Sequence, residues 1–385
     1  MSSYSSQTSS RDAPTRAAAS TRRIVPSIGR LGRSDNGRMT DTRLLTEIRE
    51  QPDVAARLLV SGPPVVDAVA AEMRRRGIGL VVIAARGTSD HAAVYAQYVL
   101  GARNGMTVAL AAPSLVTLYG ASPRYGNALV IGLSQSGRSP DVVGVVEAAR
   151  SQGALTLAIT NEPSSPLAVA AEHCVDLAAG EERSVAATKT YTAELLAVAM
   201  LSAALDDGGA RAALAGVPDA LGRALAAAPE AARIAADQAT LDRAVVLGRG
   251  FGYATAREWS LKLKEVAQLW ADPYSAADFA HGPVALLAPG SAVFAYVAAG
   301  PARDALLDPV RLLVRDVGAD AMILSDDPEA RSVGRWALPA PAGLPEWLGP
   351  IAAIVPAQLH AMHLAIARGL DPERPRGLNK VTETR

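Results

Sequence analysis

Two clusters of hydroxyl-bearing residues in this sequence have the types and spacing of an anion-binding site. The first follows an apolar run and contains Gly87, Thr88 and Ser89. The second follows another apolar run and contains Ser134, Gln135, Ser136 and Ser139. Hydroxyl groups and the free N–H groups of a helix N-terminus bind compact anions, and neither cluster carries the lysine of a nucleotide-binding loop. The pattern therefore favours a phosphate monoester over a nucleotide triphosphate.

The second cluster also contains the start of a helix. Ser139 is expected at the N-cap, Pro140 at the first helical position and Asp141 in the first turn. Serine, threonine and glycine cap helices and form turns throughout α/β proteins, so either cluster alone is most simply explained as structural. Because both clusters end strands of one unit, we favour a binding role for the pair.

The elements that must position these residues alternate between short apolar runs and longer helical stretches. This alternation predicts an α/β fold with parallel strands buried on both faces. The expected strands lie at 80–85, 107–111, 128–133, 155–159 and 174–177, and then at 244–248, 292–297, 320–324 and 336–339. Open parallel sheets bind ligands beyond the carboxyl ends of their strands, where both hydroxyl clusters fall.

The chain contains an internal duplication. VVIAARG at 81–87 recurs as AVVLGRG at 244–250, an offset of 163 residues, and VIGLSQSG at 130–137 matches VFAYVAAG at 293–300 at the same offset. A third pair, GALTLAIT from 153 and GADAMILS from 318, falls two residues later. The repeats predict two tandem domains, each a doubly wound parallel sheet flanked by helices. VAAG lacks the hydroxyls of SQSG, so one phosphate per chain is expected, in the first domain.

Composition suggests where the domains begin and end. Residues 1–38 are rich in Ser and Arg and are expected to be a disordered leader, with a transit peptide as the alternative. The first domain is expected at 39–205, a helical linker at 206–235 and the second domain at 236–370. A tail at 371–385 carries Lys380.

Charge and hydropathy exclude several classes of partner. Lys plus Arg and Asp plus Glu number 38 each, so no net charge attracts nucleic acid or an acidic membrane surface. No helix-turn-helix segment is evident, and no apolar stretch is expected to reach the roughly 18 to 20 residues that cross a bilayer. A single cysteine, Cys174, fits a reducing compartment. We therefore expect a cytoplasmic protein with neither nucleic acid nor membrane as a partner.

The histidines do not indicate a metal site. His360 and His363 lie one helical turn apart, but no nearby Cys, Asp or Glu completes a ligand set. His91 and His173 are expected to be structural. No metal and no organic cofactor is therefore expected.

Five segments together resemble the sugar isomerase (SIS) family. They are ARGTSDHA (85–92), SQSGRSPD (134–141), VAATKTYTAEL (185–195), LKLKEVAQLWADPYSAADFAHGP (261–283) and LNKVTETR (378–385). In order and spacing they are similar to the isomerase half of glutamine:fructose-6-phosphate amidotransferase (glucosamine-6-phosphate synthase) and to the stand-alone SIS-type glucosamine-6-phosphate deaminase. The resemblance runs from about Leu44 to the C-terminus and implies two tandem SIS domains.

The resemblance implies a role for each matching residue. The sugar phosphate would be bound by Thr88, Ser89, Ser134, Gln135, Ser136, Ser139, Val185 and Ala186. Glu265 would be the general base that moves a proton between C1 and C2, with Lys262 near the sugar hydroxyls or the anionic intermediate. His281 would assist ring opening from a neighbouring subunit, which implies a homodimer. Lys380 would meet the open-chain carbonyl.

The reaction needs such groups whatever the family. A ring must open with acid and base help, a carbon next to a carbonyl must lose a proton, and the resulting negative charge must be held. From the residues alone, however, Glu265 is as readily an ion-pair partner of Lys262 or Lys264 on an amphipathic helix, and Lys380 a residue of a polar tail. Departures from the family pattern that bear on the pocket are Ala187 in place of Ser, Asp272 and Asp278 in place of Glu, and Trp259 in place of a small residue.

The resemblance favours isomerising deamination, in which glucosamine 6-phosphate and water give fructose 6-phosphate and ammonia. Cys174 lies within a predicted strand and no glutaminase-sized region precedes the first SIS unit, so we expect no release of ammonia from glutamine. Three alternatives stay open. They are an aminotransferase-like isomerase that uses external ammonia, a fructosamine-6-phosphate deglycase, and a non-catalytic sugar-phosphate sensor, which the presence of Glu265, His281 and Lys380 disfavours.

Overall fold

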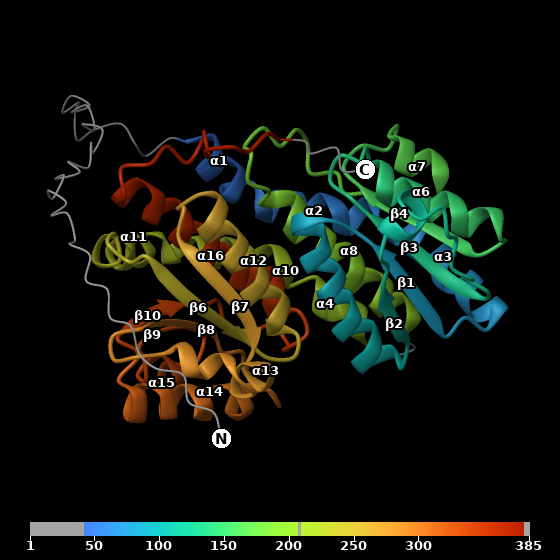
Figure 1. Cartoon of the computed structure of the whole chain (residues 1–385). Helices are drawn as coiled ribbons and strands as arrows, with labels where there is room; N and C mark the ends of the chain where they lie inside the picture. Colours follow the sequence, from blue (N-terminus) through green and yellow to red (C-terminus); the bar gives the residue numbers. More distant parts are fainter. Residues whose placement is uncertain (1–41, 207–208, 381–385) are drawn as a thin grey trace, which may run out of the picture. The chain divides into compact units, whose positions relative to one another are not determined.

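Two parallel five-stranded sheets, each flanked by helices, make up the part of the chain that the computed structural model describes, residues 42–206 and 209–380 (Figure 1). The first sheet contains β1 (Leu80–Ala84), β2 (Thr107–Leu110), β3 (Ala128–Leu133), β4 (Leu155–Thr160) and β5 (His173–Asp176). The second contains β6 (Arg243–Gly248), β7 (Trp270–Ser275), β8 (Ala292–Tyr296), β9 (Asp320–Ser325) and β10 (Trp336–Pro339). The α/β fold class is confirmed, and the predicted leader, 1–38, lies outside the described residues.

The two sheets share one topology. The first has the order β2-β1-β3-β4-β5, and the second, taken from its β7 edge, has the order β7-β6-β8-β9-β10. Every neighbouring pair is parallel, and Leu80 of β1 lies in register with Thr107 of β2 on one side and Ala128 of β3 on the other. The chain therefore reverses its winding direction between β1 and β3, and between β6 and β8. The predicted duplication is confirmed at the level of strand order.

One strand was missing from the sequence prediction. Nine strands lie within one residue of their predicted ends, but β7, with the sequence WADPYS, had been left out. Its residues are polar and include Pro273, which cannot donate a hydrogen bond to a ladder. The strand is tolerated because it lies at the edge of the second sheet and pairs with β6 alone.

Sixteen α-helices surround the sheets in the described part of the chain. Those up to the end of the first sheet's helical layers are α1 (Arg43–Arg49), α2 (Gln51–Ser61), α3 (Pro63–Arg76), α4 (Gly87–Asn104), α5 (Ser114–Thr117), α6 (Pro140–Ser151), α7 (Pro166–Ala170) and α8 (Lys189–Leu205). Those that follow are α9 (Ala210–Leu214), α10 (Val217–Ala224), α11 (Ala228–Asp237), α12 (Gly252–Glu265), α13 (Ala276–Ala280), α14 (Arg303–Leu312), α15 (Pro328–Arg331) and α16 (Gly349–Ala367). Two short 3-10 turns span Leu225–Ala227 and Pro283–Leu286, and a π-helical turn, Leu313–Val317, extends α14.

Helix α16 corrects the expectation that no apolar stretch is long enough to cross a bilayer. It has 19 residues and is apolar enough to pass that test, and α2 and α3 pass it only as a pair bent by 53°. Most of α16 is buried inside the protein, however, where it packs against α11, α12 and α10. Its apolar composition is therefore explained by its place in the core.

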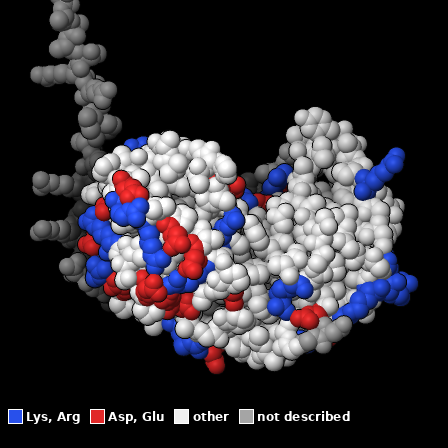
Figure 2. All heavy atoms as spheres, turned by 90° about the horizontal axis from the view of Figure 1, so that it is seen from below, with Lys and Arg blue, Asp and Glu red and all other residues white. Residues whose placement is uncertain are grey.

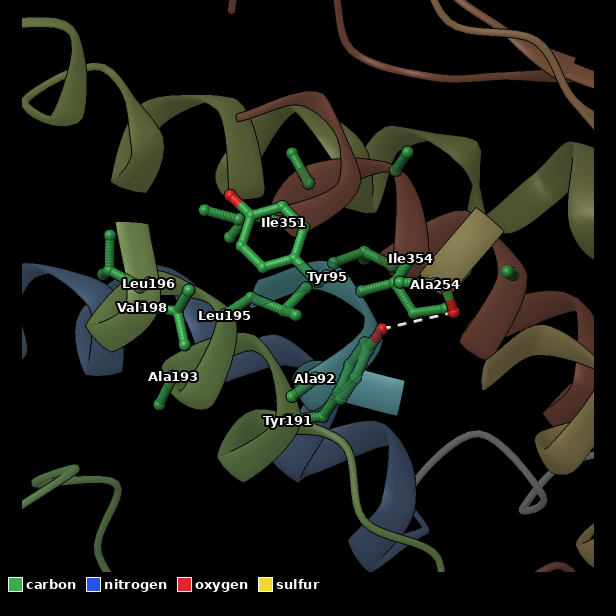
Figure 3. Packing of buried hydrophobic residues seen from close by; sticks show 14 of the residues in the cluster. Ala92, Tyr95, Tyr191, Ala193, Leu195, Leu196, Val198, Ala254, Ile351 and Ile354 are labelled. Carbon is green, nitrogen blue, oxygen red and sulfur yellow. Dashed lines mark hydrogen bonds between the residues drawn. The ribbon is translucent and has the colours of Figure 1, made fainter. Parts of the chain in front are cut away.

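The hydrophobic core continues from one half of the chain into the other through packed helices. Helix α8 is buried on all sides, and α4 packs against both α8 and α12. Figure 3 shows Tyr95 of α4 and Tyr191 of α8 among aliphatic side chains, and the Tyr191 hydroxyl donates to the Ala254 carbonyl at 3.5 Å. The Tyr95 hydroxyl donates to the Trp347 carbonyl at 2.7 Å. These contacts join residues of the first half to residues of the second.

The surface over α14 and α15 carries charges of both signs. This surface lies at the bottom of Figure 1 and faces the viewer in Figure 2, where basic and acidic side chains are intermixed on the left. Arg303 pairs with Asp327 at 2.5 Å, and Arg311 pairs with Glu329 at 2.9 Å. Mixed charge of this kind does not form a basic patch for nucleic acid on that face.

A buried polar cluster lies between α12 and α16. The Trp259 indole donates to His360 Nδ1 at 3.2 Å, and Gln238 Oε1 lies 2.7 Å from His360 Nε2, so Nε2 must carry the proton. Trp259 is fully buried and stacks on Phe294 with ring centroids 5.4 Å apart. The tryptophan therefore fills the core and does not shape the ligand cavity, contrary to the concern raised by its replacement of a small residue.

Burial lowers the pKa of His360 to about 3, and the nearby His363 adds to this effect. The histidine is neutral in the folded protein at pH values above about 3, while in the unfolded chain it binds a proton below its ordinary pKa of 6.5. Its contribution to stability is therefore complete above pH 6.5 and is lost as the pH falls from 6.5 toward 3. The slope from this one group is at most about 1.4 kcal/mol per pH unit.

We predict that His360→Met flattens the acid side of the stability profile, although it lowers stability at pH 7. The check is the free energy of unfolding in urea at several pH values between 7 and 4, compared with that of the wild type. Trp259→Phe is the control, because it removes the indole donor and keeps the histidine, and so keeps the slope. Equal slopes for His360→Met and the wild type would contradict the prediction.

Candidate active site

A cavity of about 380 Å³ lies at the carboxyl ends of β1 and β3. This is the point where the winding of the first sheet reverses, which is where open α/β sheets bind ligands. Nine of the predicted site residues line it: Thr88, Ser89, Ser134, Gln135, Ser136, Ser139, Val185, Glu265 and Lys380. The structure thus brings together residues from α4, from the loop between β3 and α6, from the segment before α8, from α12 and from the C-terminal tail.

A larger hollow of about 690 Å³ lies between α6 and α7 and is an open surface depression. Its one basic residue, Arg150, donates through Nη1 to the carbonyls of Val169, Ala170 and Ala171 at the end of α7. The Arg150 Nη1 group therefore caps the C-terminal end of α7 and is not directed at a ligand. The smaller cavity is therefore the better candidate, because its polar groups converge on one space.

The N-terminus of α4 forms one wall of the cavity. Gly87, the first helical residue, has φ of +55°, a conformation that glycine adopts without strain. The N–H groups of the first turn have no partner within the helix, and the positive end of the helix dipole favours an anion there. Thr88 and Ser89 add their hydroxyls at the same point.

The loop between β3 and α6 forms another part of the wall. Ser134 Oγ accepts from the Gly137 N–H at 3.2 Å, and Ser136 Oγ accepts from the Arg138 N–H at 3.3 Å. Each serine thus uses a lone pair to hold the loop and keeps its hydroxyl hydrogen for a ligand. Gly137 is required, because its φ is +61° and a Cβ would lie 2.1 Å from Ser165 Oγ.

The start of α6 only partly follows the prediction. Ser139 is at the N-cap and Pro140 begins the helix, as expected, but the Ser139 side chain makes no capping hydrogen bond. Its hydroxyl lines the cavity instead. Asp141 is buried and pairs with Arg86, whose Nε lies 2.6 Å from Asp141 Oδ2. Sequence reasoning missed Arg86, which lines the cavity and is held there by this ion pair.

Lys262 of α12 is buried between two carboxylates. Its Nζ lies 2.6 Å from Glu265 Oε2 and 3.2 Å from Glu258 Oε1, and it donates to Thr88 Oγ1 at 3.2 Å. Thr88 in turn donates to Glu258 Oε1 at 3.2 Å. The last turns of α12 are thereby fixed against the first turn of α4. Glu258 also lies 2.7 Å from His91 Nδ1, which gives this histidine a structural role, as predicted.

Electrostatics keep Lys262 protonated. Burial by itself would lower the pKa of Lys262, but the negative charges of Glu258 and Glu265 outweigh that effect and raise it. The raised pKa favours the charged form of the ammonium near neutral pH. The charged ammonium can hold negative charge in place, which is the role expected for this residue.

Lys380 of the C-terminal tail pairs with a second buried carboxylate. Its Nζ donates to Glu182 Oε2 at 2.9 Å, and Glu182 also accepts from the Thr188 N–H at 2.9 Å and the Thr190 hydroxyl at 2.8 Å. Burial would raise the pKa of Glu182, but Lys380 and these hydrogen bonds outweigh it, so the pKa is lowered. Glu182 is therefore an anion that holds Lys380 at the cavity wall.

A third buried carboxylate, Glu194 of α8, lines the cavity without a cation. Ser89 Oγ lies 2.7 Å from Glu194 Oε1, and Glu194 Oε2 is buried without a hydrogen-bond partner among the described residues. Burial raises the pKa of Glu194 well above its ordinary value. The hydrogen bond to Ser89 opposes this shift, and the charges of Glu182 and Glu258 add to it. Sequence reasoning assigned Glu194 no role.

Three predicted site residues do not line the cavity. Ala186 is buried in the core at 1% exposure, and Lys262 lies behind Thr88 and Glu265. His281 follows α13 and is exposed on the surface, outside the cavity of its own chain. Gly87 and Ala187, which the sequence analysis had related to the site without a binding role, also line the cavity, as do Arg86, Thr190, Glu194, Leu378 and Asn379, which it had not. Within the described ranges, no three His, Cys, Asp or Glu residues are grouped to hold a metal ion.

Comparison with known proteins relates both halves of the chain to one family. The SIS domain family model matches residues 78–204 and 239–368. The chain is similar to glutamine–fructose-6-phosphate aminotransferase (isomerizing) of Methanothermobacter thermautotrophicus, with 33% identity over 344 residues that cover 88% of this chain and 57% of that protein. The chain thus spans less than two thirds of the length of this curated relative.

Two solved structures share the arrangement of the whole described region. One is a protein of Silicibacter pomeroyi provisionally described as a phosphosugar isomerase, with 34% identity, a TM-score of 0.76, and coverage of 86% of this chain and 100% of that one. The other is the C-terminal domain of glucosamine-fructose-6-phosphate aminotransferase from Francisella tularensis. It has 25% identity, a TM-score of 0.77, and coverage of 86% of this chain and 98% of that one.

We predict that Lys262→Met destabilises the protein by about 3 to 5 kcal/mol, because it leaves the buried Glu258 without a cation. Adding Glu258→Gln to that variant should recover part of the loss. The measurement is the free energy of unfolding in urea for the single and double variants. Lys264→Met, on the exposed face of the same helix, is the matched control and should change stability little. A Lys262→Met protein as stable as the wild type would show that the buried pair is unimportant.

Proposed function

We propose that this chain, which belongs to the SIS domain family, is an isomerising glucosamine-6-phosphate deaminase. The observation that carries the proposal is one cavity that holds both hydroxyl clusters and Glu265, beside the Lys262 ammonium. A phosphate at one end and an acid–base group at the other are what the isomerisation of a sugar phosphate requires.

The phosphate would bind between α4 and the loop before α6. Ser134, Ser136 and Ser139 offer hydroxyls, and the free N–H groups at the start of α4 offer further donors. Arg86 adds a positive charge that Asp141 holds at the rim. Neutral donors and one guanidinium suit a compact dianion.

Glu265 would transfer the proton between carbons. After ring opening, its carboxylate would remove the proton from C2 of the aldose and return it to C1, giving the ketose imine. The electron pair released at C2 becomes the negative charge of an enolate. Lys380, which lines the cavity, and Lys262, which pairs with Glu265, would stabilise that charge. Because Lys262 stays protonated, proton transfer is left to Glu265.

Hydrolysis would complete the reaction. Water adds to the C2 imine of the ketose, the C–N bond breaks, and fructose 6-phosphate and ammonia leave, so that no oxidant or cofactor is consumed. The closing residues KVTETR resemble the tail of the stand-alone deaminase more than that of the synthase, which favours this direction. The aminotransferase names of the relatives support a second candidate, amination of fructose 6-phosphate with free ammonia at the same site.

We predict that purified protein releases ammonia and fructose 6-phosphate in equal amounts from glucosamine 6-phosphate. Glu265→Gln should reduce turnover by at least a factor of about 100, because general base catalysis contributes about 10² to 10⁴. The same variant should still bind fructose 6-phosphate, since Glu265 is not a phosphate ligand. The measurement couples an ammonia assay to a fructose 6-phosphate assay, with calorimetry for binding. Full turnover by the variant would show that Glu265 has no catalytic role. If the wild type neither deaminates glucosamine 6-phosphate nor aminates fructose 6-phosphate, both candidate reactions are rejected.

We also propose a homodimer in which His281 of one subunit assists ring opening in the cavity of the other. The proposal is supported by the exposure of His281 outside the cavity of its own chain. A site shared in this way needs both subunits, so an isolated monomer would be inactive.

Subunit mixing tests the shared site. Glu265→Gln and His281→Asn proteins are each expected to be nearly inactive, but a hybrid dimer contains one site with both native residues. We predict that unfolding and refolding the two variants together restores activity, because one of the two active sites in each hybrid dimer is then intact. Refolding each variant alone is the control. If the mixture stays as inactive as its parts, both residues act within one chain or His281 is not needed.

A further inference from the structure

We propose that Glu194 is a neutral carboxylic acid whose O–H donates a hydrogen bond to Ser89 Oγ. This hydrogen bond leaves the Ser89 hydroxyl hydrogen free to point toward the bound phosphate. Glu194 would then be a positioning residue, acting on the ligand through Ser89. The inference rests on the proposed phosphate site. It adds the requirement that Glu194 be protonated when phosphate binds, which the hydroxyl clusters alone do not imply.

The hydrogen bond between Ser89 and Glu194 decides what Ser89 can offer a ligand. The two oxygens lie 2.7 Å apart, and both residues line the cavity. A serine has one hydroxyl hydrogen. If Glu194 were an anion, it would accept that hydrogen, and Ser89 would present only lone pairs to a phosphate. If Glu194 is protonated on Oε1, the oxygen that faces Ser89, its O–H can donate to Ser89 Oγ, and the serine hydrogen is then free for the phosphate.

The surroundings of Glu194 favour the neutral form. Its side chain is buried at 1% exposure, and Oε2 finds no partner within the part of the chain that the structure describes. The charged groups that face it are Glu182, on the segment before α8, and Glu258 of α12. Neither offers a hydrogen bond to a third carboxylate, and from α4 only the uncharged Ser89 hydroxyl reaches it.

The cations near Glu194 are already engaged. Lys262 bonds to Glu258 and Glu265, and Lys380 bonds to Glu182. Arg86, across the cavity, is paired with Asp141. A buried carboxylate without a cation is costly to ionise, and this agrees with the raised pKa of Glu194.

A bound phosphate would strengthen the same preference. It brings two negative charges into a cavity whose wall contains Glu194 and Glu265. An ionised Glu194 would repel the phosphate, whereas a neutral Glu194 would donate to Ser89 and leave the serine hydroxyl free to donate to the phosphate. Phosphate affinity should therefore fall as the pH rises through the pKa of Glu194, because the form that binds is the protonated one.

The test is the binding of inorganic phosphate to the full chain by calorimetry between pH 7.5 and 10. Phosphate is mostly the dianion at pH 7.5 and almost entirely so at higher pH, and comparison of the variants at each pH removes the effect of its own titration. Glu194→Gln keeps the shape and a neutral donor, so it should bind within about threefold of the wild type at pH 7.5. Glu194→Met keeps the length without a donor, so it should bind about tenfold more weakly or worse. As the pH rises, the wild type should lose affinity relative to Glu194→Gln.

A spectroscopic measurement separates this role from simple packing. The infrared spectrum of the phosphate-bound wild type at pH 7.5, minus that of phosphate-bound Glu194→Gln, should contain the carbonyl band of a protonated carboxylic acid. This readout stands even if Glu194→Met fails to fold. Absence of that band, or binding by Glu194→Gln as weak as that by Glu194→Met, would overturn the inference.

The two proposals fail in different ways. Inactivity toward glucosamine 6-phosphate would reject the proposed function and leave the phosphate measurements as they are. A wild type that binds no phosphate at any pH would reject the phosphate site, and the role of Glu194 with it. Normal phosphate binding with an unprotonated Glu194 would reject only the inference.

Discussion

The buried ammonium of Lys262 joins the two halves of the chain at the point where the cavity forms. It lies between Glu258 and Glu265 of its own helix and also donates to Thr88, the second residue of α4. A charge this deep is tolerated only because oxygen atoms surround it. The need to satisfy one cation therefore fixes α12 against α4, and with it the distance between the first turn of α4 and the carboxylate of Glu265.

The duplicated topology makes this arrangement possible. α4 and α12 each follow the strand at the same place in their sheets, and they pack against each other. The two copies have since diverged in chemistry. The first retains the hydroxyls of SQSG, and the second has VAAG at the matching place but carries the lysine and glutamates of α12. The hydroxyl groups of SQSG and the charged groups of α12 thus come from different copies and meet at one interface.

The sequence predicts most of the fold because its information is local. Apolar runs locate nine strands, and a hydroxyl next to the end of a strand, such as Ser134, must lie at that edge of the sheet. The omission of β7 has a local cause too, since Pro273 and polar residues hide an edge strand. Glu194 could not be found in this way. It belongs to a mostly apolar helix, and its partner Ser89 is 105 residues away, so their meeting depends on how α4 packs against α8.

Three buried glutamates around the cavity show how neighbours, and not residue type, set the charge of a site. Glu258 has Lys262 and His91 as partners, and Glu182 has Lys380 and two threonine donors. Glu194 has one serine. A buried carboxylate is stable as an anion where a cation or several donors meet it, and as an acid where they do not. Glu258 and Glu182 each hold a lysine, Lys262 and Lys380, at or just behind the cavity wall, whereas Glu194 has only the Ser89 hydroxyl as a partner among the described residues.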